Sequence, residues 1–159
     1  CHATGFKILM DCKAGRASKA LETLKKIMPD SEKNPSARSG AEPYVFTNCY
    51  STHPGYYGKS YQSWTTGTSV WCMMGVYEGI MGVKRDYEGL MVDPCFPAEW
   101  EEAEVTRHFR GADYHIVVHN PGHLENGRGT VRVDGKICPD SVLPDFRDGK
   151  RHEVEVLLG

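Results

Sequence analysis

Residues 69–82 read SVWCMMGVYEGIMG, and this stretch decides the fold. Apolar side chains cover most of the circumference of a helix over 69–81, so the pattern predicts a helix packed on nearly all sides. Gly75 and Gly79 indicate close contact with another helix, and Gly82 suits the position just after the helix ends. The hydrophobic period changes after Gly82. The chain therefore divides near residue 84 into a helical part and a β part.

The chain ahead of this stretch is first helical and then irregular. Residues 4–28 show helical spacing of apolar residues, with a break at Gly15 and an end at Pro29-Asp30. Residues 29–67 are rich in proline, glycine and tyrosine, and a loop of this length is either functional or disordered. The aromatic residues argue against disorder. Beside amides and hydroxyls they suit a sugar site, while an ordinary packed loop explains the composition equally well.

The chain behind this stretch has the two-residue period of β-strands. A short strand is predicted over 87–92, and alternation from Val105 onward predicts strands around 114–118, 131–133 and 154–158. Asp134-Gly135 is a strong signal for a two-residue hairpin. The predicted fold class is α+β, in which helices precede a small antiparallel β domain.

Composition limits the classes of partner. The 159 residues suit one domain or two small pieces, and a formal charge of −2 gives no electrostatic reason to expect nucleic acid or an anionic membrane. No apolar run approaches the roughly 20 residues that span a bilayer. The six cysteines are widely spaced without a CxxC pair, so we expect free thiols in a reducing compartment, the cytoplasm. The chain opens on Cys1 rather than Met, and we expect it to be the tail of something larger.

Thr66-Gly67-Thr68 stands directly before the predicted helix and is the candidate anion site. Backbone N–H groups at a helix start attract anions, Gly67 allows the backbone to approach closely, and Thr66 adds a hydroxyl donor. The simpler alternative is a helix N-cap at Thr68 or Ser69. The loop lacks the lysine of a nucleotide phosphate loop. His2 could donate to a phosphate oxygen or be an ordinary histidine.

Other ionisable residues give weaker signals. Histidines at positions 108, 115, 119 and 123 resemble a metal cluster, but the sequence around them has no cysteine or carboxylate at ligand spacing. A solvated strand face is therefore favoured for them, and no metal site is expected. Glu42 and Asp93 each precede a proline and could be site residues or turn anchors. No pair of carboxylates can be assigned the separation that glycoside hydrolysis requires.

Five short segments occur in a familiar order and spacing: 42–45 (EPYV), 63–68 (SWTTGT), 86–90 (DYEGL), 93–97 (DPCFP) and 105–111 (VTRHFRG). In this series the chain resembles, over nearly its whole length, the C-terminal part of the inverting disaccharide phosphorylases of glycoside hydrolase family 94. That family includes the cellobiose, cellodextrin, chitobiose and laminaribiose phosphorylases. Residues 2–7 look closer to the cellodextrin and laminaribiose enzymes than to the cellobiose enzymes.

The resemblance implies an architecture and a reaction. Residues 1–83 would be the last helices and site loops of an (α/α)6 catalytic barrel, and residues 84–159 its C-terminal antiparallel β domain. Inorganic phosphate would cleave β-glucosidic bonds of short gluco-oligosaccharides of the cellodextrin or cellobiose type, with inversion, to give α-glucose 1-phosphate. Phosphate is then a substrate and no cofactor is implied. The implied partners are the sugar, the remainder of the same polypeptide and a second copy in a homodimer.

The same resemblance assigns phosphate binding to His2, Thr66 and Gly67. A family glutamine that contacts the sugar falls at Asn48, whose shorter side chain indicates another linkage or chain-length preference. Glu42 and Tyr44 would also bind substrate. The general acid, an aspartic acid, would lie upstream of His2. No catalytic residue is therefore assigned in this chain, and the isolated chain is expected to be inactive.

Two other classes of protein remain open at this point. A cyclic β-glucan synthase or a hydrolase could carry the same terminal module, and the threonine–glycine loop would then bind something other than free phosphate. A non-catalytic carbohydrate-binding module could be built on the β part. Most of the aromatic residues lie before residue 84, which argues against that module.

Overall fold

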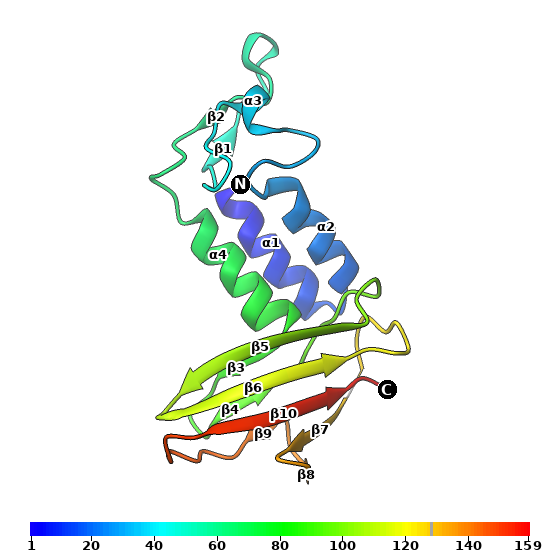
Figure 1. The fold of residues 1–159 in the computed structure, drawn as a ribbon. Coiled ribbons are helices and arrows are strands. Elements are labelled where there is room, and N and C mark those ends of the chain that lie inside the picture. Colours follow the sequence, from blue (N-terminus) through cyan, green and yellow to red (C-terminus); the bar gives the residue numbers. More distant parts are fainter. Residues whose placement is uncertain (128) are drawn as a thin grey trace.

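The computed structural model describes residues 1–127 and 129–159 and has an α+β architecture. Three helices stand on a two-sheet β part, and a loop-rich segment covers the opposite end of the helices (Figure 1). In the described residues no helix combines the length and the apolar character needed to cross a bilayer.

The first two helices confirm the predicted helical region and its break. Helix α1 (His2–Lys13) and helix α2 (Ala17–Ile27) form an antiparallel pair around Gly15, which has the left-handed φ of 70°. The side chain of Asp11 is buried beside the turn and accepts hydrogen bonds or ion pairs from Lys7 and Arg16. These contacts satisfy a carboxylate that would otherwise be costly to bury, and they hold the turn in place.

The deciding stretch forms α4 (Thr68–Met74), which continues directly into the π-helical segment η2 (Gly75–Ile80). The predicted close helix contact is confirmed. A Cβ atom at Gly75 would lie 2.7 Å from Ile8 Cγ2, and one at Gly79 would lie 2.9 Å from Cys12 Sγ, so α1 runs against the glycine face. Gly82 follows the helix with a φ of 67°, also as predicted.

Packing on nearly all sides was the wrong expectation for this helix. Val70 and Met73 are 58% and 57% exposed. The helix carries apolar side chains on all sides, and among the described residues its packed face is the one toward α1, while the face with Val70 and Met73 is open to solvent. Apolar residues on all sides of a helix indicate that all of its faces can be buried. They do not show that the elements that would pack against those faces lie within residues 1–159.

The segment of residues 29–67 is ordered around short elements at the upper end of the helices (Figure 1). These elements are α3 (Ser36–Ser39), β1 (Cys49–Tyr50), the 3₁₀ turn η1 (Pro54–Tyr56) and β2 (Ser60–Tyr61). Strands β1 and β2 pair in antiparallel fashion, with Cys49 opposite Tyr61. This small ribbon extends toward the first turns of both α1 and α4.

Two sheets share one core in the β part. A three-stranded sheet has the order β3-β4-β9, with β3 (Val83–Arg85), β4 (Leu90–Val92) and β9 (Val142–Leu143). The strand predicted over 87–92 is shorter than expected because residues 87–89 form the turn before β4. The core between the sheets contains Phe96, Tyr114 and Ile116, all fully buried.

The second sheet has five strands in the order β5-β6-β10-β7-β8. They are β5 (Glu102–Phe109), β6 (Ala112–His119), β7 (Thr130–Val133), β8 (Lys136–Cys138) and β10 (Arg151–Leu157). Asp134-Gly135 forms the predicted hairpin, with positive φ at both residues. The expectation of a purely antiparallel sheet is corrected by β10, which lies parallel to β6 and antiparallel to β7. Alternation shows which side chains face the core but carries no information on strand direction.

The helical and β parts are joined by direct contacts. Trp100 packs against the hydrophobic clusters of both parts and meets Phe96 edge-on, with ring centroids 5.5 Å apart. Asn126 Nδ2 donates to the carbonyl of Gly15 over 3.1 Å. The β part is thereby fixed against the turn between α1 and α2.

His152 is buried within the β part and holds two turns together. Its Nδ1 lies 2.8 Å from Asp134 Oδ2, its Nε2 lies 3.1 Å from Asp148 Oδ1, and its ring stacks on Phe146 at 3.6 Å. Burial alone would lower the pKa of His152, but the two carboxylates outweigh it and raise the pKa above its usual 6.5. The imidazolium can donate to both carboxylates at once.

Because the folded pKa of His152 is raised, its contribution to stability is complete below pH 6.5 and is lost as the pH rises through the folded pKa. We expect the free energy of unfolding, measured by urea denaturation from pH 5.5 to 9, to fall over this window. His152→Gln should reduce the slope of the free energy of unfolding against pH. The slope that remains is attributed to His115, whose pKa is raised by Glu153. A slope unchanged in His152→Gln, with exposed His53→Gln as the control, would contradict this assignment.

Candidate functional site

The structure brings His2 and Gly67 together at the first turns of α1 and α4. A Cβ atom at Gly67 would lie 2.9 Å from His2 Cε1 and 3.4 Å from His2 Nε2. The His2 ring is half-buried and lies near Phe6, which in turn contacts Trp71 of α4 at 4.3 Å between ring centroids. The absence of a side chain at residue 67 therefore lets the imidazole lie directly against the backbone of the loop.

Thr66 and Thr68 order the loop before α4. Thr68 is fully buried, and its hydroxyl donates to the carbonyl of Thr47 over 3.1 Å. Thr66 Oγ1 accepts from the amide of Thr68 at 3.1 Å and lies 2.7 Å from Thr68 Oγ1. The first intrahelical donor is Trp71, which bonds to the carbonyl of Gly67. The amides of 67, 69 and 70 precede that donor and have no intrahelical acceptor, which is the arrangement that suits an anion.

Asn48 links the two helix starts. Its carbonyl accepts from the amide of His2 at 3.2 Å, and its side-chain Oδ1 accepts from Thr66 Oγ1 at 3.3 Å. Its Nδ2 donates to Gln62 Oε1 over 3.0 Å across the ladder that extends β1 and β2. Both ends of the Asn48 amide therefore have protein partners. The side chain positions Thr66 and Gln62.

Glu42 and Trp64 form a second polar contact on the same loop. Trp64 Nε1 donates to Glu42 Oε1 over 2.8 Å, and this hydrogen bond lowers the pKa of the Glu42 carboxyl, which is ionised at neutral pH. Trp64 is 69% exposed and Tyr44 is 74% exposed. An ionised carboxylate beside exposed aromatic faces can hold both a hydroxyl edge and an apolar face of a ligand.

Of the four histidines that resemble a metal cluster in the sequence, those at 108, 115 and 119 lie on the outer face of the five-stranded sheet, and His123 lies in the loop after β6. His115 lies between Glu153 and Glu104, at 2.6 and 3.1 Å, and His119 pairs with Glu102 at 2.9 Å. The sequence lacked carboxylates at local ligand spacing, and the sheet supplies them from neighbouring strands. Within 1–127 and 129–159, no three His, Cys, Asp or Glu side chains gather as metal ligands do.

Sequence reasoning missed two residues of this site and the anchoring role of a third. Thr47, Gln62 and the role of Thr68 in anchoring the ribbon become visible only when β1 and β2 pair. Gln62 has a φ of 55°, a left-handed conformation that is uncommon outside glycine. Two-residue strands leave too short a pattern for detection, so the sequence offered no usable signal for this ribbon. Asp93, the alternative carboxylate, lies at the junction with the β part, away from this group.

Comparison with known proteins identifies one family and several relatives of this chain. Residues 1–82 match the family model of the catalytic domain of the glycosyl hydrolase 94 superfamily. The chain is 40% identical to the solabiose phosphorylase of Paenibacillus borealis and 37% identical to a 3-O-beta-D-glucopyranosyl-beta-D-glucuronide phosphorylase of the same organism. It is 32% identical to the N,N'-diacetylchitobiose phosphorylase of Vibrio proteolyticus.

These alignments cover nearly all of this chain and a small share of each relative. The matches span 98%, 99% and 99% of the chain but 20%, 21% and 20% of the three relatives. The chain therefore spans about a fifth of the length of the curated relatives that it matches.

Gly67→Ala tests the contact between His2 and the loop. The φ of −85° at this residue permits alanine, so the expected effect is displacement of the His2 ring by the new methyl group. We expect a shift of the His2 ring signals in the NMR spectrum and about tenfold weaker binding of inorganic phosphate in a chemical-shift titration, as for loss of one hydrogen bond to a charged group. Gly55→Ala is the matched control because its nearest neighbour lies 3.7 Å away. Equal phosphate affinity in the two variants would contradict the role given to this contact.

Proposed function

Because this chain belongs to the glycosyl hydrolase 94 superfamily, we propose that it is the C-terminal part of an inverting sugar phosphorylase. The whole enzyme cleaves β-glucosidic bonds of short gluco-oligosaccharides with inorganic phosphate and releases α-glucose 1-phosphate. The three relatives are all named as phosphorylases, and this supports the reaction class. The oligosaccharides proposed are of the cellodextrin or cellobiose type, and the names of those relatives add other disaccharides for testing.

The observation that carries the proposal is the contact of His2 with Gly67 beside Thr66. Phosphate placed here meets an imidazole, a hydroxyl and the free amides of a helix start. These groups neutralise part of its charge and aim one oxygen at the anomeric carbon, which is catalysis by positioning and electrostatics. Phosphate replaces the base-activated water of an inverting hydrolase, so one carboxylic acid suffices. That acid, an aspartic acid, is proposed to lie upstream of His2.

The sugar is proposed to bind beside the phosphate, against the loop of residues 42–64. The carboxylate of Glu42 accepts a hydrogen bond from a sugar hydroxyl, and Tyr44 offers an aromatic face to the sugar ring. Asn48 holds the loop in position through Gln62 and Thr66. Because the Asn48 amide already bridges Thr66 and Gln62, we assign the outward contact to the exposed side chain of Gln62. The Oε1 atom of Gln62 accepts from Asn48, so the two Nε2 hydrogens of this exposed side chain are available to a ligand.

The division of the chain and its assembly are parts of the same proposal. Residues 1–83 are assigned to the end of an (α/α)6 catalytic barrel and residues 84–159 to a C-terminal β domain. The enzyme is proposed to be a cytoplasmic homodimer. The open apolar face of α4 supports the barrel, because a barrel supplies further helices to cover such a face.

Phosphate dependence tests the proposed reaction. The longer protein that contains this chain is incubated with cellobiose, cellotriose, laminaribiose, solabiose and N,N'-diacetylchitobiose, with and without inorganic phosphate, and sugar 1-phosphate is measured. We expect product from at least one sugar only when phosphate is present, and no product from the isolated chain because the acid is upstream. Cleavage without phosphate would indicate a hydrolase. Product from the isolated chain would overturn the assignment of the acid.

Gln62→Ala and Asn48→Ala separate the two halves of the site. In the longer protein, Gln62→Ala is expected to raise KM for the sugar about threefold to tenfold, the effect of one lost hydrogen bond, with KM for phosphate unchanged. Asn48→Ala is expected to raise KM for the sugar and KM for phosphate, because it releases Thr66 as well as Gln62. His53→Ala, at the exposed tip of the same loop, is the control. A change in KM for phosphate alone in Gln62→Ala would remove Gln62 from the sugar site.

A further inference from the structure

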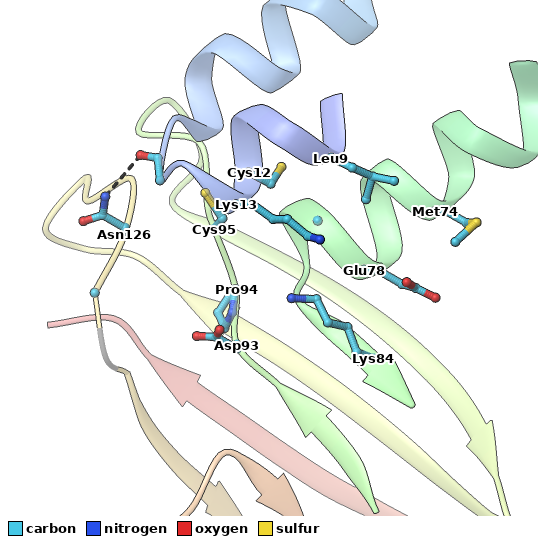
Figure 2. A pocket seen from close by; sticks show the side chains of 13 residues that line it. Leu9, Cys12, Lys13, Met74, Glu78, Lys84, Asp93, Pro94, Cys95 and Asn126 are labelled. Carbon is cyan, nitrogen blue, oxygen red and sulfur yellow. Dashed lines mark hydrogen bonds between the residues drawn. The ribbon is translucent and has the colours of Figure 1, made fainter. Parts of the chain in front are cut away.

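A cavity of about 750 Å³ lies at the junction of the helical and β parts, at the end of the helices farthest from His2 and Gly67. Its walls come from the last turn of α1, from η2, from the start of β3 and from the segments 93–95 and 126–127. Figure 2 shows two lysines, Lys13 and Lys84, and two cysteines, Cys12 and Cys95, around this space. Neither the proposed phosphate site nor the sugar site uses these residues.

Cys12 and Cys95 are brought together from distant parts of the chain. Cys12 lies in the last turn of α1, and Cys95 follows β4 on the segment that leads to the five-stranded sheet. Both side chains are largely buried, both line the cavity, and both belong to the same packed cluster (Figure 2). The interaction between the two thiol groups raises the pKa of Cys12 and lowers the pKa of Cys95. Burial opposes the thiolate form of both, as do Glu125 and Asp93 at Cys95 and Asp11 at Cys12, while Lys84 favours it to a smaller extent.

The backbone on both sides holds the two thiols in place. A Cβ atom at Gly79 would lie 2.9 Å from Cys12 Sγ, so the sulfur lies directly against the backbone of η2. The amide of Cys95 donates to the carbonyl of Ile80 over 3.1 Å. The adjacent Gly82 and Asp93 are also bonded through the backbone, at 3.0 Å. Both cysteines are therefore held by the same segment, η2 and the residues that follow it, and they line one cavity.

We propose that Cys12 and Cys95 form an oxidisable dithiol, a modification site that closes to a disulfide when a peroxide enters the cavity. The thiolate of Cys95 attacks one peroxide oxygen, the O–O bond breaks, and hydroxide leaves and takes up a proton as water. The sulfur of Cys12 then attacks the sulfenic acid, the S–S bond forms, and a second water leaves with the thiol proton. Two thiols and one hydrogen peroxide give one disulfide and two waters.

The surroundings fit this chemistry better than they fit a structural role alone. A low-pKa thiolate beside a second thiol, close to ammonium groups and reachable from a cavity, is the environment in which cysteines oxidise selectively. Closure would join the C-terminal turn of α1 covalently to the segment that carries the β part. A thiol reductant reverses the bond by exchange through a mixed disulfide.

Peptide mapping after oxidation tests the dithiol. The chain is treated with hydrogen peroxide at a small molar excess, remaining thiols are alkylated, and non-reduced digests are analysed by mass spectrometry. We expect a cross-linked peptide pair containing Cys12 and Cys95, loss of two hydrogens from the intact mass, and full reversal by dithiothreitol. Exposed Cys49 and half-buried Cys138 provide the matched control, because Cys49→Ser/Cys138→Ser should retain the cross-link.

Thermal unfolding gives a second readout, and the comparison of the reduced and the oxidised unmodified chain supplies it without any cysteine variant. Oxidation is expected to raise Tm in the unmodified chain and in Cys49→Ser/Cys138→Ser, and to leave Tm unraised in Cys12→Ser. Separate oxidation of the two thiols to sulfinic acids without a cross-linked pair would overturn the proposal. So would a cross-link of either thiol to Cys49 or Cys138 in place of the expected pair.

Discussion

The close approach of α1 to α4 and η2 is the constraint on which the rest of the structure depends. The contact is lined by glycines whose Cβ atoms would overlap the partner helix, at 2.5 Å for Gly5, 2.7 Å for Gly75 and 2.9 Å for Gly79. Each glycine inside a helix costs about 1 kcal/mol relative to alanine, so close packing must offset that cost. The approach brings the first turns of both helices together, and the His2 ring then lies against Gly67.

The ribbon of β1 and β2 turns this helix contact into a site. It reaches both helix starts, because the carbonyl of Asn48 accepts from His2 and the carbonyl of Thr47 accepts from Thr68. A loop fixed at two such points loses little further entropy when a ligand binds. The sequence separation is large, but the hydrogen bonds bring His2, Asn48 and Thr66 into one group. Their arrangement is therefore a property of the packed helices.

The sequence predicted the helices, the break at Gly15, the hairpin at Asp134-Gly135 and the buried face of β6, because each depends on local pattern or turn chemistry. It did not predict the parallel pairing of β10 with β6, which depends on the path of the chain between distant strands. At the site, local pattern alone left open either an anion site at Thr66-Gly67 or a simple N-cap at Thr68 or Ser69, whereas the N-cap residue in the structure is Gly67. The contact with His2 is a tertiary feature that no spacing in the sequence encodes.

The contact of α1 with α4 and η2 has a different chemical character at its two ends, although the same geometric feature occurs at both. Where a glycine of the opposite segment meets α1, the α1 side chain facing it lies directly against the backbone: His2 at Gly67 and Cys12 at Gly79. At the upper end the constrained group is a proton donor beside free amides. At the lower end it is a thiol beside a second thiol. A helix of twelve residues is about 18 Å long and stiff, so a bond formed at Cys12 fixes the same rigid element that presents His2. The proposed phosphate site and the proposed dithiol are therefore connected through a single helix.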